Sequence, residues 1–445
     1  MARAMLQSTW RREISYQEPQ ENMSVTLYTA RLTFPVSAPP IRDGAVAAED
    51  GRILAVGTTA DLRGRYPGAR VVDLGERALL PGLVNAHTHL ELTHHAGHVP
   101  DQLPLIEWIY PLVSYSRTRT PEDFERAVGA GVENLRASGT VAVGEICTFG
   151  QSARPLVESG LHGVVYYELL SPDPARADEL LRKGQQQIER WRREYPQSRI
   201  RFGLAPHTPY TVSAELLGAV ADWCRAEDVP LTIHAAESPA ETQFLRDATG
   251  PIADLLYPGA GWPIHPERAP GVSPIAWLDQ LGVLMARPLL AHGVQVDVDD
   301  VARIAQAGAA VAHCPHSNIQ LQCGRMPWEL YYAAGVRLAL GTDSLASSPS
   351  LAVWDEAVYA ETLHSAAGEP LAPSELLRLA TLGGADALGL ADTLGSLASG
   401  KLAALACLPL DTLSPDERGN PDAVLAAMVD GRIAPDALPA TSSSM

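Results

Sequence analysis

PGLVNAHTHLE, residues 81–91, leads from an apolar segment into two histidines and a carboxylate. In a β-strand the side chains of residues i and i+2 lie on the same face, so His87 and His89 can point at one object. A bare His-x-His pair is more often two ordinary loop histidines. Its meaning therefore depends on whether later strands also end in polar residues that can bind a metal.

The composition describes a globular, acidic chain. Of its 445 residues, 46% are hydrophobic and 19% are charged, and the formal net charge is −18. An acidic surface disfavours nucleic-acid backbones and anionic membranes, so we expect neither as a partner. A small nucleoside remains compatible with the charge, because one pocket does not have to follow the net charge.

The cysteines and the first residues bear on the compartment. The five cysteines are scattered, odd in number and free of any Cys-x-x-Cys motif, which favours a reducing, cytoplasmic location. There is no apolar run of about 18 residues that could span a membrane. Residues 1–22 are polar and carry no signal-peptide core, so we expect a disordered extension, or sequence upstream of a start at Met23.

Both ends of the chain carry short strand-like runs. Residues 24–80 alternate apolar and polar positions between Pro, Gly and Asp, which is typical of a small antiparallel sheet. Residues 395–408 and 426–433 have a similar pattern. We therefore predict one composite β-sandwich domain, made of residues 24–80 plus 391–434, followed by a loose tail at 435–445.

The middle of the chain, residues 81–390, alternates strand-like and helical segments. Thr120-Pro121, for example, is typical of a helix start and predicts a helix over 120–137. The pattern predicts an α/β fold, a (β/α)8 TIM barrel. An open doubly wound sheet is the alternative, which the lack of a Gly-x-Gly-x-x-Gly motif weakens. Residues 248–274 interrupt this alternation of strands and helices, and are either a surface loop or a lid. The predicted strands are 82–87, 140–145, 162–170, 200–206, 229–234, 288–292, 309–313 and 336–343.

Six of the predicted strands end on histidine or aspartate. In such a barrel, the catalytic groups lie at the carboxyl ends of the strands. Imidazole and carboxylate together suit zinc or iron, and three His with one Asp leave room for a water whose pKa the metal would lower. Glu237, three residues beyond His234, is placed to move protons. The residues at these ends are His87, His89, His207, His234, His292, His313 and Asp343.

The motifs PGLVNAHTH, HAAE, AHG and GTDS occur in this order and together resemble the amidohydrolase superfamily, more narrowly its mononuclear deaminase branch. The resemblance implies one divalent metal ion per chain, zinc or iron. The ligands it implies are His87, His89, His234 and Asp343. It also implies that His292 and Asp343 orient and deprotonate the water, while Glu237 protonates the ring nitrogen beside the attacked carbon.

The lysines bear on the number of metal ions. Binuclear members of the superfamily use a lysine at the end of the fourth strand, which here ends on His207. The chain has only two lysines, Lys183 and Lys401, and neither falls at a predicted strand end. We therefore expect one metal ion per chain.

Three further segments resemble parts of nucleoside deaminases. GLAPHTPYTVS, residues 203–213, resembles a motif of S-adenosylhomocysteine and methylthioadenosine deaminases whose histidine, here His207, contacts the purine. LIEWI, residues 105–109, resembles the segment whose glutamate, here Glu107, accepts hydrogen bonds from ribose hydroxyls. HTHLELT, residues 87–93, resembles aminodeoxyfutalosine deaminases, and makes Glu91 either a pocket residue or a loop residue that supports His89. An arginine would meet the carboxylate of such a substrate, and the sequence does not identify it.

The motifs and the resemblance together predict a metal-dependent hydrolytic deaminase of an adenine nucleoside, with 6-aminodeoxyfutalosine converted to futalosine and ammonia. The alternatives are a deaminase of S-adenosylhomocysteine, methylthioadenosine or adenosine, and, further away, a chlorohydrolase or a cyclic-amide hydrolase. A non-catalytic binding protein would not need the full set of ligands together with Glu237. A homo-oligomer is compatible with the sequence.

Overall fold

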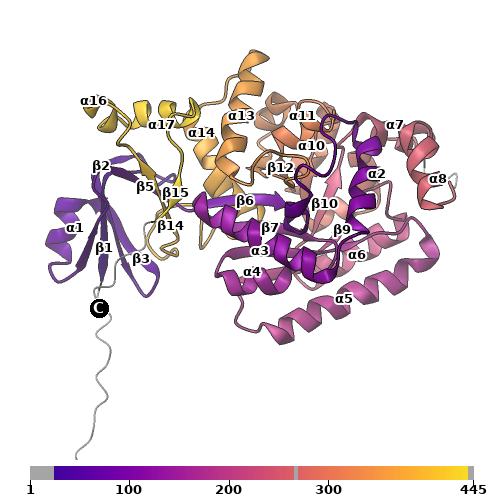
Figure 1. Ribbon diagram of the computed structural model, residues 1–445, viewed down its shortest axis with the longest axis horizontal. Coiled ribbons are helices and arrows are strands. Elements are labelled where there is room, and N and C mark those ends of the chain that lie inside the picture. Colours follow the sequence, from indigo (N-terminus) through magenta and orange to yellow (C-terminus); the bar gives the residue numbers. More distant parts are fainter. Residues whose placement is uncertain (1–24, 265–268, 439–445) are drawn as a thin grey trace, which may run out of the picture.

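The computed structural model describes residues 25–264 and 269–438, and places a large barrel beside a smaller β domain (Figure 1). The extension predicted at 1–22 lies outside the described residues. Of the helices that the structure describes, none has the length and the apolar character needed to cross a membrane.

The larger part is the predicted barrel. Its strands form two four-stranded parallel sheets, β6-β7-β8-β9 and β10-β11-β12-β13. Two parallel bridges, Leu204 with Leu231 and Thr88 with Asp343, join the sheets into a closed ring. All eight predicted strands are present, which confirms the barrel. The strands are β6 (Leu83–Thr88), β7 (Thr140–Cys147), β8 (His162–Leu169), β9 (Ile200–Pro206), β10 (Thr232–Ala235), β11 (Leu289–His292), β12 (Ala310–His313) and β13 (Arg337–Leu340).

The strands are mostly apolar up to their carboxyl ends because helices cover the ring from outside and side chains fill it from inside. Every residue of β6, β10, β11 and β12 is buried. Parallel strands buried on both faces read as continuous apolar runs, which is why the sequence located them well. Small side chains of the inner cluster pack together, among them Val84, Ala142, Val164, Ala205 and Ala312.

Helices follow the strands, and their ends are capped as the sequence indicates. In α3 (Pro121–Ala137), Thr120 and Asp123 form a reciprocal capping box, and Phe124 and Val128 face the core. The other helices are α1 (Thr59–Arg65), α2 (Leu105–Ser116), α4 (Ala153–Ser159), α5 (Ala177–Glu194), α6 (Ala214–Ala226), α7 (Pro239–Asp247), α8 (Tyr257–Ala260), α9 (Pro274–Gln280), α10 (Val298–Ala307), α11 (Pro315–Gln320), α12 (Trp328–Ala333), α13 (Val353–Ala366), α14 (Pro373–Arg378), α15 (Gly384–Ala387), α16 (Pro415–Arg418) and α17 (Pro421–Val429).

The smaller part unites both ends of the chain, as predicted. In Figure 1 the indigo amino-terminal strands lie beside the yellow carboxyl-terminal ones. They form one seven-stranded sheet in the order β15-β14-β5-β1-β2-β3, with β4 also paired to β1. The junction is the antiparallel pairing of β5 with β14. The strands are β1 (Thr26–Thr33), β2 (Ile41–Glu49), β3 (Arg52–Thr58), β4 (Arg70–Asp73), β5 (Arg77–Pro81), β14 (Leu405–Pro409) and β15 (Asp436–Ala437).

Two predictions near the carboxyl end are wrong. The first half of the strand expected at 426–433 belongs to helix α17, which Asn420 caps and which buries Val424 and Met428. An apolar run of this length fits a buried helix as well as a strand. The loose tail begins later than expected, because residues 436–437 pair with β14 as β15.

The segment 248–274 is partly helical. It contains the π-helical turn η3 (Ile252–Leu256) and α8, and its residues 265–268 lie outside the described chain. Tyr257 is fully buried and donates a hydrogen bond from its hydroxyl to the carbonyl of Tyr210, at 2.8 Å. Ile252 is buried as well. The described part of this segment is therefore a packed wall beside the barrel mouth.

Candidate active site

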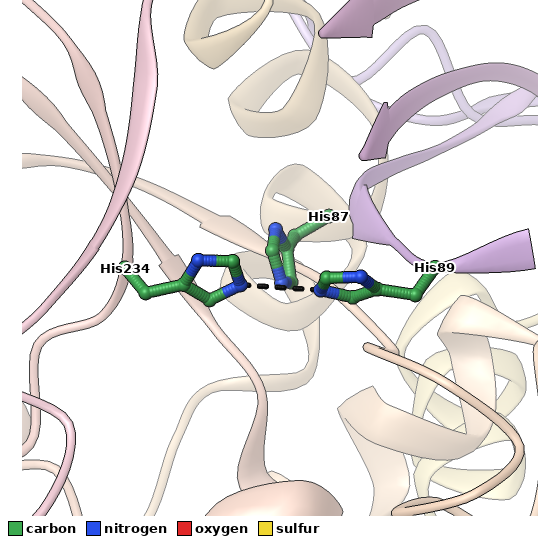
Figure 2. Close-up of side chains that lie close together, drawn as sticks. All are labelled: His87, His89 and His234. Carbon is green, nitrogen blue, oxygen red and sulfur yellow. Dashed lines mark hydrogen bonds between the residues drawn. The ribbon is translucent and has the colours of Figure 1, made fainter. Parts of the chain in front are cut away.

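Three histidines from two distant strands meet at the carboxyl ends of the barrel strands. His87 and His89 come from the end of β6, and His234 comes from β10. Figure 2 shows the three rings converging, with the Nε2 atoms of His89 and His234 only 3.1 Å apart. The ring centroid of His87 lies 5.0 Å from that of His89 and 4.9 Å from that of His234. One ion could therefore contact all three side chains.

Asp343, just beyond β13, completes one side of this cluster. Its Oδ1 lies 3.9 Å from Nε2 of His87 and 3.5 Å from Nε2 of His89. Its Oδ2 accepts hydrogen bonds from the hydroxyls of Ser317, at 2.6 Å, and Ser347, at 3.0 Å. Burial alone would raise the pKa of Asp343, but the neighbouring histidines and the Ser317 hydroxyl outweigh it and hold the pKa below its usual value. The carboxylate is thus ionised and oriented.

Glu237 and His292 face the cluster from the fifth and sixth strands of the barrel. Nε2 of His292 lies 3.6 Å from Oε1 of Glu237, and both side chains are buried. Nδ1 of His292 lies 2.8 Å from Oδ1 of Asn318, so the ring donates there and leaves Nε2 for the site. Burial raises the pKa of Glu237, which favours a carboxyl group that can both give and take a proton.

The donor set fits a divalent metal ion. Nε2 of His87 is buried and has no hydrogen-bond partner among the described residues. His234 donates from Nδ1 to the backbone carbonyl of His207, at 3.1 Å, which leaves a lone pair on its Nε2. Burial lowers the pKa of both His87 and His234, so both rings stay neutral. Neutral imidazoles with an ionised carboxylate are the ligands that zinc and similar ions take.

A cavity of about 1010 Å³ opens from this cluster. It is lined by His89, His234, Glu237, His292 and Asp343 at its inner end, and by His207 beside them. Nδ1 of His207 lies 2.8 Å from the Thr211 hydroxyl, which fixes the ring. Of the described residues predicted to bind substrate, His207 lines the cavity, whereas Glu91 and Glu107 do not.

Glu91 supports a loop, which corrects its predicted place in the pocket. It is buried, and its carboxylate accepts the backbone N–H groups of Phe149, at 2.7 Å, and Gln151, at 2.6 Å. Burial raises its pKa to about 7 in spite of these hydrogen bonds. The sequence left open whether Glu91 lies in the pocket or supports His89. The contacts favour a supporting role, but the part that Glu91 supports is the loop after β7 and not His89.

Glu107 lies on α2, next to residues whose side chains line the cavity. Trp108 and Ile109 contribute to the lining. Oε2 of Glu107 is buried and has no hydrogen-bond partner among the residues described. Its predicted contact with a sugar hydroxyl therefore stays a prediction.

Sequence reasoning missed Glu168, which lies at the end of β8 and lines the cavity. One of its carboxylate oxygens lies within 4.8 Å of ring nitrogens of His207 and His234. Its Oε1 is buried and without a hydrogen-bond partner in the described part of the chain. The available signal was a carboxylate at the end of the third barrel strand, a position equivalent to those that carry the histidines.

The protein is a closed eight-stranded barrel with histidines and carboxylates at one cavity. Together with the similar proteins described below, this arrangement identifies it as an enzyme that hydrolyses carbon–nitrogen bonds. The chain belongs to the amidohydrolase family, whose model matches residues 78–434. A model of the bacterial imidazolonepropionase-like composite domain matches residues 44–69, within the small β domain.

Three known proteins are similar to this chain over most of its length. An aminodeoxyfutalosine deaminase of Deinococcus radiodurans is 39% identical over 353 residues, which cover 78% of this chain and 81% of the relative. A 5-methylthioadenosine/S-adenosylhomocysteine deaminase of Syntrophobacter fumaroxidans is 34% identical, over 81% of this chain and 79% of the relative. The crystal structure of a zinc-bound adenosine deaminase from Xanthomonas campestris superposes with a TM-score of 0.77 at 30% identity, and covers 91% of this chain and 88% of the other.

Proposed function

We propose that the protein is a metal-dependent deaminase that hydrolyses 6-aminodeoxyfutalosine, an adenine nucleoside, to futalosine and ammonia in the cytoplasm. The observation that carries the proposal is the approach of Glu237 and His292, 3.6 Å apart, to a cluster of three histidines and Asp343 at the inner end of one large cavity. The relative of highest identity among those described, an aminodeoxyfutalosine deaminase, supports this substrate.

In this proposal His87, His89, His234 and Asp343 hold one zinc or iron ion. When bound, such an ion supplies Lewis acidity, which makes a water molecule acidic enough to react near neutral pH. The unpaired Nε2 of His87 and the neutral state of the buried rings support this assignment.

The protein's own groups then orient the water and move protons. Asp343 and His292 orient the water and accept its proton, because one is an ionised carboxylate and the other has Nε2 directed at the site. Glu237 is the acid for the ring nitrogen beside the amino-bearing carbon, because burial raises its pKa. Water adds to that carbon, the carbon–nitrogen bond breaks, and the amino group leaves with the transferred proton as ammonia.

The cavity supports a substrate larger than a free base. Its volume of about 1010 Å³ is at the upper end of the range for small-molecule pockets, about 300–1,000 Å³. His207 is fixed beside the metal cluster, where a purine would lie. Glu168 offers an unpaired carboxylate oxygen next to His207, which suits a hydrogen-bond donor of the substrate.

A second candidate is a deaminase of methylthioadenosine or S-adenosylhomocysteine, which the relative at 34% identity favours. Ammonia release from purified protein separates the two. We expect the highest kcat/KM for 6-aminodeoxyfutalosine, and lower values for methylthioadenosine, S-adenosylhomocysteine and adenosine. A higher kcat/KM for methylthioadenosine or S-adenosylhomocysteine would contradict the first proposal and favour the second candidate.

A further inference from the structure

The cavity has two ends with different chemistry. The inner end carries the histidines and carboxylates of the metal cluster, which are buried except for the partly buried His89. The outer end is lined by apolar side chains that are partly open to solvent, namely Tyr110, Val113 and Phe149 at 38–41% exposure. A substrate that fills the cavity must therefore carry a second group beyond the part that reacts.

Two arginines line this outer end. Arg117 follows α2 directly, and Arg119 lies two residues further on, in the turn that leads to α3. Neither forms an ion pair within 4.0 Å of an acidic residue in the described part of the chain, although the net charge of the protein is −18. Two arginines that line the same cavity without an ion pair of their own, in so acidic a protein, mark a place for an external anion.

Local contacts hold Arg119 in place without neutralising it. Its Nε donates a hydrogen bond to the Thr118 hydroxyl, at 3.1 Å, and its guanidinium lies 4.7 Å from the ring centroid of Tyr115. These contacts leave the terminal nitrogens available to a ligand. Asp123, four residues further along the chain, forms its ion pair with Arg126.

An aromatic surface lies beside the two arginines. The rings of Phe124 and Phe149 stack with centroids 3.9 Å apart, and both line the cavity. The backbone N–H of Phe149 donates a hydrogen bond to Glu91, which fixes the main chain of the loop after β7. A flat apolar face next to two guanidinium groups suits a carboxylate carried by a ring or an apolar chain.

We propose that Arg117 and Arg119 form a subsite for a carboxylate at the far end of the substrate, and that this subsite selects anionic nucleosides over neutral ones. The inference rests on the proposed function, because it takes the amino-bearing ring to lie at the inner end. It identifies two specificity-determining residues that touch the substrate away from the reacting atoms.

The test compares matched substrates on matched variants. Ammonia release is measured for 6-aminodeoxyfutalosine, its methyl ester and methylthioadenosine with wild type and R117Q/R119Q. We expect the double variant to lose about 10- to 100-fold in kcat/KM on the acid and less than about twofold on the two neutral substrates. R126Q, whose arginine pairs with Asp123 and does not line the cavity, should match wild type.

Equal losses on the acid and on the neutral substrates would overturn the proposal, because they would indicate a structural role for the arginines. Unchanged selectivity in the double variant would overturn it as well. Benzoate titration tests the subsite without catalysis: weak binding that high salt abolishes is expected for wild type and not for R117Q/R119Q. If wild type binds benzoate but deaminates no nucleoside, the proposed function fails and the anion subsite stands.

Discussion

Nε2 of His89 and Nε2 of His234 face each other at 3.1 Å across the mouth of the barrel, although 145 residues separate them in the chain. Strand β6 begins one four-stranded half of the barrel and β10 begins the other. Closure of the ring therefore brings the two histidines together. Because the carbonyl of His207 takes the other ring hydrogen of His234, the facing nitrogen is a lone-pair donor. The geometry suits a shared cation better than a hydrogen bond between two rings.

Glu237→Gln should abolish turnover and leave the metal in place. The amide keeps the shape of the side chain but cannot transfer a proton, and the loss of a general acid costs about 10² to 10⁴ in rate. Ammonia release and metal analysis of the same sample check both expectations. Loss of the metal from this variant would mean that Glu237 is a ligand and that its proposed role is wrong.

Asn318→Ala should lower kcat while the metal content stays constant. Asn318 accepts from Nδ1 of His292 at 2.8 Å, and so fixes which nitrogen of that ring faces Glu237. Loss of such a supporting contact typically costs about 10- to 100-fold in activity. Asn134→Ala, on the exposed side of α3, is the control. Full activity in Asn318→Ala would contradict the proposed role of His292 in proton transfer.

Glu91→Gln should weaken the fold without changing the order of substrate preference. The amide has one acceptor oxygen in place of two, so one of the two backbone hydrogen bonds, to Phe149 or to Gln151, is lost. We expect the free energy of unfolding to fall by about 1–3 kcal/mol. Denaturant unfolding and kcat/KM ratios for two nucleosides measure the two effects. A changed ratio with unchanged stability would restore the pocket role for Glu91.

Buried carboxyl groups should make the protein less stable as the pH rises. Burial raises the pKa of Glu145 and of Glu241 from 4.5 to about 8. Between those values each of these groups binds more protons in the folded state than in the unfolded state, so its contribution to the free energy of unfolding is fully present below about pH 4.5 and is lost as the pH rises to about 8. Urea unfolding at pH 5.5 and pH 8.5 should show this decrease.

Glu145→Gln tests the origin of that pH dependence. Its side chain cannot ionise, so the decrease between the two pH values should be smaller than in wild type. Glu189→Gln, on the exposed face of α5, should keep the decrease of wild type. An equal decrease in Glu145→Gln and wild type would rule out Glu145 as a contributor.

The sequence predicted the barrel well because its strands are buried on both faces and read as short apolar runs. His87, Glu237 and Asp343 could be found in the same way, since each follows such a run directly. Helix α17 could not be separated from a strand, because AVLAAMV is apolar throughout and has no clear period. Strand β15 has only two residues, too few for any pattern.

The side chains around the substrate were harder to predict, for a physical reason. Glu91 lies next to the metal cluster in sequence, yet its carboxylate turns away to bind the backbone of another loop. Arg117 and Arg119 lie in a turn, where no periodicity indicates which side chain faces the cavity. Only the closed barrel and the packing of α2 against it settle these directions.

The most direct test of the central claim is ammonia release from the purified wild-type protein, with metal analysis of the same sample. We expect turnover of 6-aminodeoxyfutalosine with one equivalent of zinc or iron per chain, and little activity with guanine. Failure to deaminate 6-aminodeoxyfutalosine, S-adenosylhomocysteine, methylthioadenosine and adenosine by a metal-loaded protein would contradict it. A metal content near two per chain would contradict the mononuclear site.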